Sequence, residues 1–267
     1  MNPHVKLATV TQSEISPAEW RARVDLAATY RLIAHYGWAD VIYNHSSMRV
    51  PGEERKFLIK RHELLYTEVT PSNLVKVSMD DDLDESAGVN RPGFTLHGGV
   101  LSARPDVNCA VHVHTDIGMA LAGLQHGLRM VSQPAVRFYN RVGYHDHEGI
   151  TEDFGERTRI NNALGKSRAL IMRNHGLLTV GQTAREAFVL MKSLIEAAAI
   201  QHKNGSDRRR LDRNPGRDLR KDRAPIRASR FRSWLGRLAG VPAHARCHRP
   251  AVAELSAVAP NADEARG

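Results

Sequence analysis

Short apolar runs of strand length alternate with helix-like stretches along residues 20 to 202, and this alternation limits the chain to a mixed fold. In the helix-like stretches the apolar residues recur at helical spacing, whereas the runs between them are bounded by turn-forming residues. We expect extended structure over 40–43, 56–60, 74–79, 107–114, 128–131 and two runs within 168–180, and helices over 17–35, 94–103, 116–125, 153–164 and 183–202. Strands interleaved with helices at this density predict one α/β domain with a central sheet covered by helices.

The net charge of +9 is confined to the C-terminal part of the chain. Residues 1–203 hold 23 Lys and Arg against 22 Asp and Glu, whereas residues 204–267 hold 15 against 7, and 14 of those 15 are Arg. Apolar periodicity nearly vanishes there, so we expect the α/β domain over 1–205 and an Arg-rich tail over 206–267. Three interpretations of this tail stay open: a disordered segment, an arm that binds nucleic acid or another polyanion, and a shifted reading frame after about Lys203.

The composition indicates a water-soluble protein of a reducing compartment. The first twenty residues lack the apolar stretch of a secretory signal, and no apolar run approaches the roughly 20 residues of a membrane span. Cys109 and Cys247 are too few for a disulfide framework, so we expect reduced thiols. The expected location is therefore cytoplasmic, without contact to a membrane.

Two histidines on one predicted strand are the first candidate ligands. Strand alternation puts His112 and His114 on the same face, about 7 Å apart at the Cβ atoms, so both rings can reach one cation. His175 adds a third imidazole at a bend that Gly176 permits. Three neutral imidazoles with an open fourth position are typical of a catalytic zinc site or of a similar divalent metal. The alternative is a set of ordinary polar residues on a half-buried strand.

Five motifs make residues 20 to 201 resemble the class II aldolase and adducin N-terminal domain family, in particular its adducin-like bacterial branch. They are 91–97 (RPGFTLH), 104–107 (RPDV), 110–115 (AVHVHT), 144–150 (YHDHEGI) and 173–178 (RNHGLL). The resemblance implies a three-layer α/β/α sandwich around a mostly antiparallel or mixed sheet. It also implies a divalent metal, Zn²⁺ or Fe²⁺, Mn²⁺ or Co²⁺, held by His112, His114 and His175. A homo-oligomer, often a tetramer with sites between subunits, is the implied assembly.

The chain departs from this family's sugar-phosphate enzymes at two places. Their acidic residue, four positions before the residue that matches His97, corresponds to Gly93. The segment that matches their phosphate-binding loop is 58–63 (LIKRHE), without their Thr-Gly pair, although Lys60 and Arg61 could attract an anion. We therefore do not expect the substrate to carry a phosphate.

The group that exchanges a proton with the substrate has to come from elsewhere. The two candidates are Glu148, in a polar loop that comes near the site in the family, and His97, near the start of a short helix. A turn role for Glu148 and a packing role for His97 are the alternatives, and Tyr139 and Tyr144 could also donate a proton.

Three functions fit these observations. The first is a divalent-metal-dependent lyase of the aldolase or epimerase type that acts on a small hydroxycarbonyl compound. The second is an Fe(II)-dependent oxidative decarboxylase, because relatives with similar histidines bind iron. The third is a non-catalytic, adducin-like binding or scaffold protein, which the missing carboxylate at Gly93 allows.

Overall fold

A computed structural model describes residues 9–80, 83, 88–149 and 154–206, so the predictions for the Arg-rich tail lie almost wholly outside the described residues. The strands are β1 (His45–Val50), β2 (Glu53–Ile59), β3 (Val75–Ser78), β4 (Cys109–Val113), β5 (Val142–His145), β6 (Ala169–Met172) and β7 (Gly176–Gly181). The α-helices are α1 (Pro17–His35), α2 (Arg91–Ala103), α3 (Asp116–Ala122), α4 (Gln133–Val136), α5 (Phe154–Leu164) and α6 (Ala184–Ser206), and the two short 3₁₀ helices are η1 (Gln12–Glu14) and η2 (Tyr66–Glu68).

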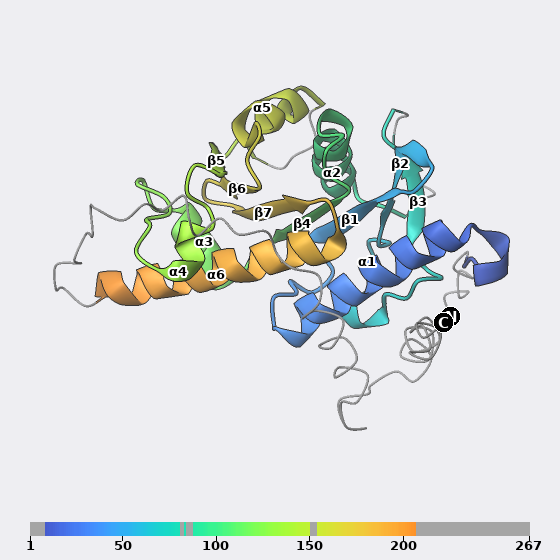
Figure 1. Cartoon of the computed structure of the whole chain (residues 1–267), viewed down its shortest axis with the longest axis horizontal. Helices are drawn as coiled ribbons and strands as arrows, with labels where there is room; N and C mark the ends of the chain where they lie inside the picture. Colours follow the sequence, from blue (N-terminus) through green and yellow to red (C-terminus); the bar gives the residue numbers. More distant parts are fainter. Residues whose placement is uncertain (1–8, 81–82, 84–87, 150–153, 207–267) are drawn as a thin grey trace, which may run out of the picture.

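The seven strands form one mixed sheet with the order β3-β2-β1-β4-β7-β6-β5 (Figure 1). Every neighbouring pair is antiparallel except β5 and β6, which run parallel. Strand β4 occupies the centre, between β1 and β7, so its side chains lie in the best-covered part of the sheet.

Helices cover both faces of this sheet, which confirms the expected three-layer α/β/α sandwich. Helices α2 and α5 lie on one face, and α1, α3, α4 and α6 lie on the other (Figure 1). Alternation along β4 divides its side chains between two cores. Val111 joins the core under α1 and α6, whereas Ala110 joins the core under α2 and α5. The face that carries Ala110 also receives His112.

Local signals predicted the long helices well and some short strands poorly. Helix α1 begins after Ser16, whose side chain accepts a hydrogen bond from the Glu19 amide, and the chain leaves it through Gly37 at φ +69°. The run expected over 40–43 forms only an isolated bridge, and the strand here is β1, which no apolar periodicity indicated. No strand forms over 128–131, and β5 forms over 142–145, where the sequence predicted neither a helix nor a strand.

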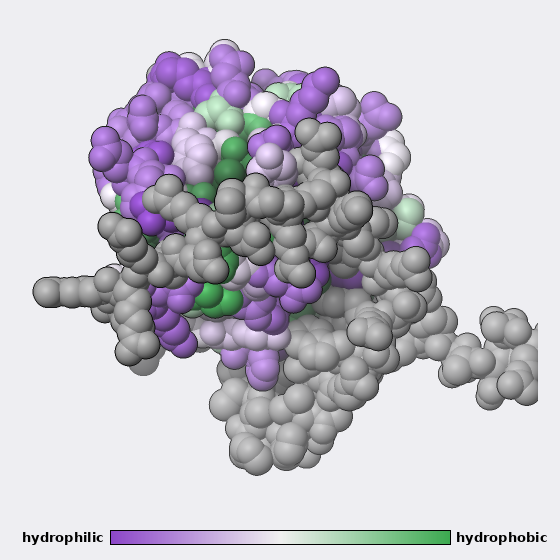
Figure 2. Space-filling model, turned by 60° about the vertical axis from the view of Figure 1, so that its left-hand side comes forward, coloured by the Kyte–Doolittle hydropathy of each residue, from purple (hydrophilic) through white to green (hydrophobic). Residues whose placement is uncertain are grey.

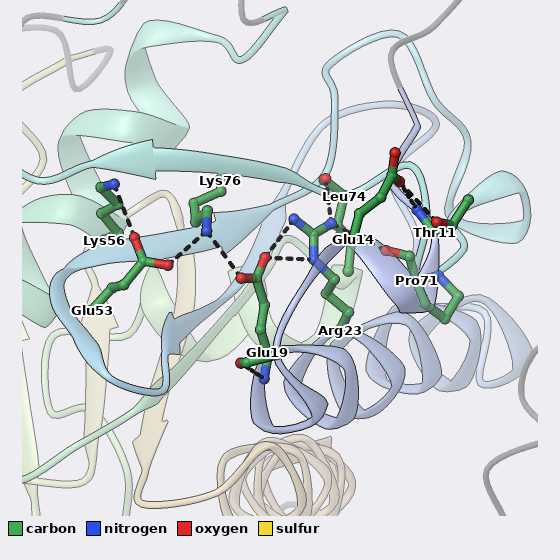
Figure 3. A network of polar contacts seen from close by, with 10 residues as sticks. Thr11, Glu14, Glu19, Arg23, Glu53, Lys56, Pro71, Leu74 and Lys76 are labelled. Carbon is green, nitrogen blue, oxygen red and sulfur yellow. Dashed lines mark hydrogen bonds and ion pairs between the residues drawn. The ribbon is translucent and has the colours of Figure 1, made fainter.

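The Glu19 side chain joins a network of charged groups at the start of α1. Its carboxylate accepts from Arg23 at 2.9 Å and from Lys76 at 2.9 Å, and Lys76 continues to Glu53 on β2 (Figure 3). Arg23 also donates to the carbonyl of Leu74. Since Glu19 and Arg23 are both buried, this network fixes α1 against the β2–β3 edge of the sheet.

Apolar residues are concentrated inside the sandwich. Hydrophilic side chains cover most of the described surface visible in Figure 2, with apolar ones confined to small areas. Among the helices of the described residues, none combines the length and the apolar character needed to cross a bilayer.

Candidate metal centre

Three histidines converge at the end of the central strands. His112 lies on β4, His114 directly follows it, and His175 occupies the turn between β6 and β7. This turn is tight, because Asn174 takes φ +55° and a Cβ on Gly176 would lie 2.7 Å from the Val113 carbonyl oxygen. The close approach of β7 to β4 therefore requires a residue without a side chain at position 176.

The three rings are within reach of one ion. The centroid of the His114 ring lies 4.7 Å from the centroid of the His112 ring and 4.7 Å from that of the His175 ring. The centroids of the His112 and His175 rings lie 5.0 Å apart. One nitrogen from each ring can be chosen so that all three lie within 4.8 Å of one another. The structure thus brings together the three imidazoles that the sequence nominated.

The hydrogen bonds of His112 and His114 leave the correct nitrogens for a cation. His112 Nδ1 lies 3.0 Å from the Leu177 carbonyl oxygen, which only accepts, so this nitrogen carries the proton. His114 Nδ1 lies 3.3 Å from the Asp40 carboxylate, and the same reasoning applies. The two Nε2 atoms then face each other at 2.9 Å with lone pairs and no proton between them. A shared cation removes this repulsion, so the donor set fits a divalent metal.

Burial keeps all three rings neutral, as a metal ligand must be. It is the main cause that lowers the pKa of His112 well below the usual value, and the neighbouring histidines lower it further. Burial also lowers the pKa of His175 to about 4. It lowers the pKa of His114 as well, although the Asp40 carboxylate opposes that shift.

A strained loop holds Asp40 against His114. Val41 in this loop takes φ +47°, a conformation that a β-branched residue rarely adopts. The buried amine of Lys60 donates to the Ile42 carbonyl at 2.6 Å, and the Tyr66 hydroxyl donates to the Tyr43 carbonyl at 3.0 Å. These bonds stabilise the loop, and through it the carboxylate that orients His114.

The anion site considered for Lys60 and Arg61 is not formed by these side chains. Lys60 Nζ donates to three carbonyl oxygens, and burial lowers its pKa to about 8. Arg61 pairs with Glu63 at 2.6 Å. Both cations are therefore engaged with groups of the protein itself.

The two expected proton-transfer residues contact different partners. Glu148 forms an ion pair with Arg159, at 2.7 Å from Nε, and its carboxylate lies 3.9 Å from His145 Nε2. His97 is fully buried on α2, where its Nδ1 lies 2.7 Å from the Ser47 hydroxyl. Their catalytic roles stay predictions.

Two further histidines border the cluster and were not nominated from the sequence. The exposed His147 has its ring centroid 6.0 Å from that of His175. His45 on β1 is the direct cross-strand partner of His112 and is 4% exposed. The signal for His45 was weak, because it precedes two serines in a run without apolar periodicity.

Buried neutral histidines should make the fold sensitive to acid. Burial lowers the pKa of His97 to about 3, so the unfolded chain takes up a proton below pH 6.5 while the folded chain does not. The free energy of unfolding is therefore not reduced by this effect above pH 6.5. Below pH 6.5, His97 alone should lower it by about 1.4 kcal/mol for each pH unit, or by about 3 kcal/mol at pH 4.5. Urea unfolding above pH 6.5 and at pH 4.5 measures this loss of unfolding free energy. The loss should be smaller for His97→Gln than for the wild type, and it should equal the wild-type loss for His126→Gln, a control at an exposed histidine. Equal losses in all three proteins would contradict this.

Known proteins resemble the chain over the region that carries the three histidines. The family model for the Class II Aldolase and Adducin N-terminal domain matches residues 24–202. A protein of Caulobacter vibrioides, whose name assigns it provisionally to aldolase class 2, is 42% identical over 192 residues, which make up 71% of this chain and 75% of that protein. Alpha-adducin of Rattus norvegicus is also 42% identical, over 212 residues, but the match spans 76% of this chain and only 29% of alpha-adducin.

A solved structure agrees with the sequence matches. The aldolase II superfamily protein from Pseudomonas syringae superimposes with a TM-score of 0.78 at 37% sequence identity. The superposition covers 86% of this chain and 95% of that chain. The similarity therefore extends over the whole sandwich.

Proposed function

Because the chain belongs to the class II aldolase and adducin N-terminal domain family, we propose that it is a divalent-metal-dependent lyase of the aldolase or epimerase type. The observation that carries this proposal is the convergence of His112, His114 and His175, with one nitrogen from each ring within 4.8 Å of the others. Zn²⁺ is the first candidate, and Fe²⁺, Mn²⁺ and Co²⁺ suit the same imidazole donors.

The three imidazoles would hold the cation, which supplies Lewis-acid polarisation of a substrate carbonyl when bound. His112 and His114 present their Nε2 atoms because the Leu177 carbonyl and the Asp40 carboxylate fix the opposite side of each ring. Their burial lowers the pKa of both rings and so keeps them unprotonated. A three-histidine set leaves a coordination position open to the oxygen atoms of a substrate.

The substrate we propose is a small hydroxycarbonyl compound without a phosphate group. Lys60 and Arg61, the cations of the segment that would match a phosphate-binding loop, are engaged with carbonyl groups and with Glu63. Uncharged hydroxyl and carbonyl groups need no such cation.

A homo-oligomer is part of the proposal, with a tetramer as the form that the family resemblance implies. Val41 and Tyr43 are 65% and 53% exposed, and both lie in the loop that holds Asp40 against His114. Covering these apolar side chains with a second copy would bury the loop that holds Asp40 beside the three histidines.

Removing the metal should abolish turnover. We expect retro-aldol cleavage of a hydroxycarbonyl panel to fall at least about 100-fold after dialysis against a chelator, because the polarisation of the carbonyl is lost. One equivalent of Zn²⁺ should restore it, and metal analysis before and after dialysis checks the stoichiometry. Unchanged turnover by the metal-free protein would refute the proposed lyase.

The 42% identity to alpha-adducin favours a second candidate, a binding or scaffold module without catalysis. This function would use the same sandwich as a docking domain, and the absence of a carboxylate at Gly93 is compatible with it. Protein that holds zinc at full stoichiometry but converts no compound of the panel would favour this candidate.

A further inference from the structure

His45 is a buried histidine with an unused hydrogen-bonding atom. It is 4% exposed, and its Nε2 has no hydrogen-bond partner among the described residues. Both side-chain polar atoms of the preceding Asn44 are also buried without a partner in this part of the chain, and Asn44 takes φ +67°. Because buried polar groups are nearly always paired, two consecutive residues of this kind indicate polar atoms kept for a ligand.

The position of His45 relates it directly to the metal centre. It pairs with His112 in the β1–β4 ladder, so both side chains leave the sheet on the same face. Cross-strand neighbours have Cβ atoms about 5 Å apart. A substrate oxygen or carbon next to the cation on His112 would therefore lie close to the His45 ring.

The His45 ring occupies the space that a side chain at position 93 would need. A Cβ on Gly93 would lie 2.8 Å from His45 Nδ1 and 2.9 Å from Cε1, closer than real Cβ contacts allow. The same Cβ would lie 2.6 Å from the Asn90 side-chain oxygen, which caps α2. Position 93 therefore has no room for a carboxylate beside the His45 ring.

We propose that His45 exchanges the proton with the substrate, through the Nε2 atom that has no partner among the described residues; this inference rests on the proposed lyase function. Nε2 accepts the proton from the carbon next to the substrate carbonyl, and the electron pair of that C–H bond moves into the carbonyl to give an enediolate. The imidazolium then returns a proton to the same carbon, and the electron pair moves back. No oxidant or other reactant is consumed.

The geometric part can be tested without turnover. Gly93→Ala should lower the midpoint of thermal unfolding, because its Cβ overlaps the His45 ring. In the His45→Ala background the same substitution should lower this midpoint by less, since only the overlap with the Asn90 side chain is left. Equal costs in both backgrounds would overturn the placement of the ring.

The chemical part is tested by deuterium uptake into hydroxyacetone in D₂O, followed by proton NMR with zinc-loaded protein. His45→Ala should lower the exchange rate about 100-fold or more, with the zinc content unchanged. The double variant His45→Ala/Gly93→Glu should recover about tenfold, because removing the ring makes room for a carboxylate. His126→Gln is the matched control, since this exposed histidine lies outside the cluster, and it should retain wild-type exchange.

The outcomes separate this inference from the proposed function. Wild-type exchange by His45→Ala, or loss of its zinc along with the activity, overturns the role of His45 and leaves the lyase in place. A zinc-loaded wild-type protein that neither exchanges hydroxyacetone nor cleaves any compound of the panel refutes both. His45→Gln, which keeps a polar group of similar size, should stay as slow as His45→Ala if proton transfer is the function.

Discussion

His112→Ala is expected to leave the protein without bound zinc and without retro-aldol turnover. The two remaining rings, His114 and His175, would supply only two ligands, whereas catalytic zinc sites use three protein ligands. The loss in zinc affinity should exceed the roughly 10- to 100-fold that a missing hydrogen bond to a ligating histidine costs. Metal analysis and competition with a zinc-binding dye measure the first effect, and the hydroxycarbonyl panel measures the second.

Three further variants test whether the loss of zinc is specific to the proposed ligands. Asp40→Asn keeps the shape of the group that faces His114 Nδ1 but removes its charge, so zinc affinity should fall by about 10- to 100-fold. His126→Gln alters an exposed histidine outside the cluster and should change nothing. Because His112 is buried, His114→Asn at a more exposed ring provides a second ligand variant if His112→Ala does not fold. Zinc at wild-type stoichiometry in folded His112→Ala or His114→Asn would contradict the proposed centre.

The pair His112 and His114 could be predicted because alternation along a strand is a local property. The third histidine could be nominated but not placed, since 61 positions separate His114 from His175. The structure joins them through the antiparallel pairing of β4 with β7, which sets the β6–β7 turn beside the end of β4. This pairing depends on long-range contacts that residue spacing does not record.

His45 was missed for a related reason. Its strand, β1, begins with His45, Ser46 and Ser47, all buried although polar, so the run lacks the alternation that marks a strand. Their burial follows from the position of β1 between β2 and β4, which only the assembled sheet reveals. The polar residues that made β1 hard to predict are also those that place His45 beside the candidate metal centre.

Strand β5 was not predicted from the sequence, because Val142–His145 is short and lies among Tyr and His residues. It forms by pairing in parallel with β6, an interaction that local sequence does not encode. Its Gly143 lies directly against the Ala163 carbonyl group of α5, and this contact has a measurable consequence.

Gly143→Ala is expected to destabilise the protein by about 3 kcal/mol or more, at the upper end of what overpacking costs. A Cβ at this position would lie 2.0 Å from the carbonyl oxygen and 2.9 Å from the carbonyl carbon of Ala163 on α5. Both atoms belong to the backbone, so no side-chain rotation relieves the overlap and the helix has to move away from the sheet. Such a movement would open the core that α5 and α2 cover.

Gly123→Ala is the matched control for this effect. Gly123 ends α3 at φ −76°, and its nearest neighbours would lie 3.6 Å or more from the added methyl group, so alanine fits without strain. The free energy of unfolding in urea should stay within about 0.5 kcal/mol of the wild type for this variant. A Gly143→Ala protein as stable as Gly123→Ala would mean that α5 does not touch the β5 backbone. Strand β5 leads directly into the loop with His147 and Glu148, and the His147 ring lies near His175. A displaced α5 should therefore also weaken zinc binding. This second effect would distinguish the displacement of α5 from a defect confined to position 143.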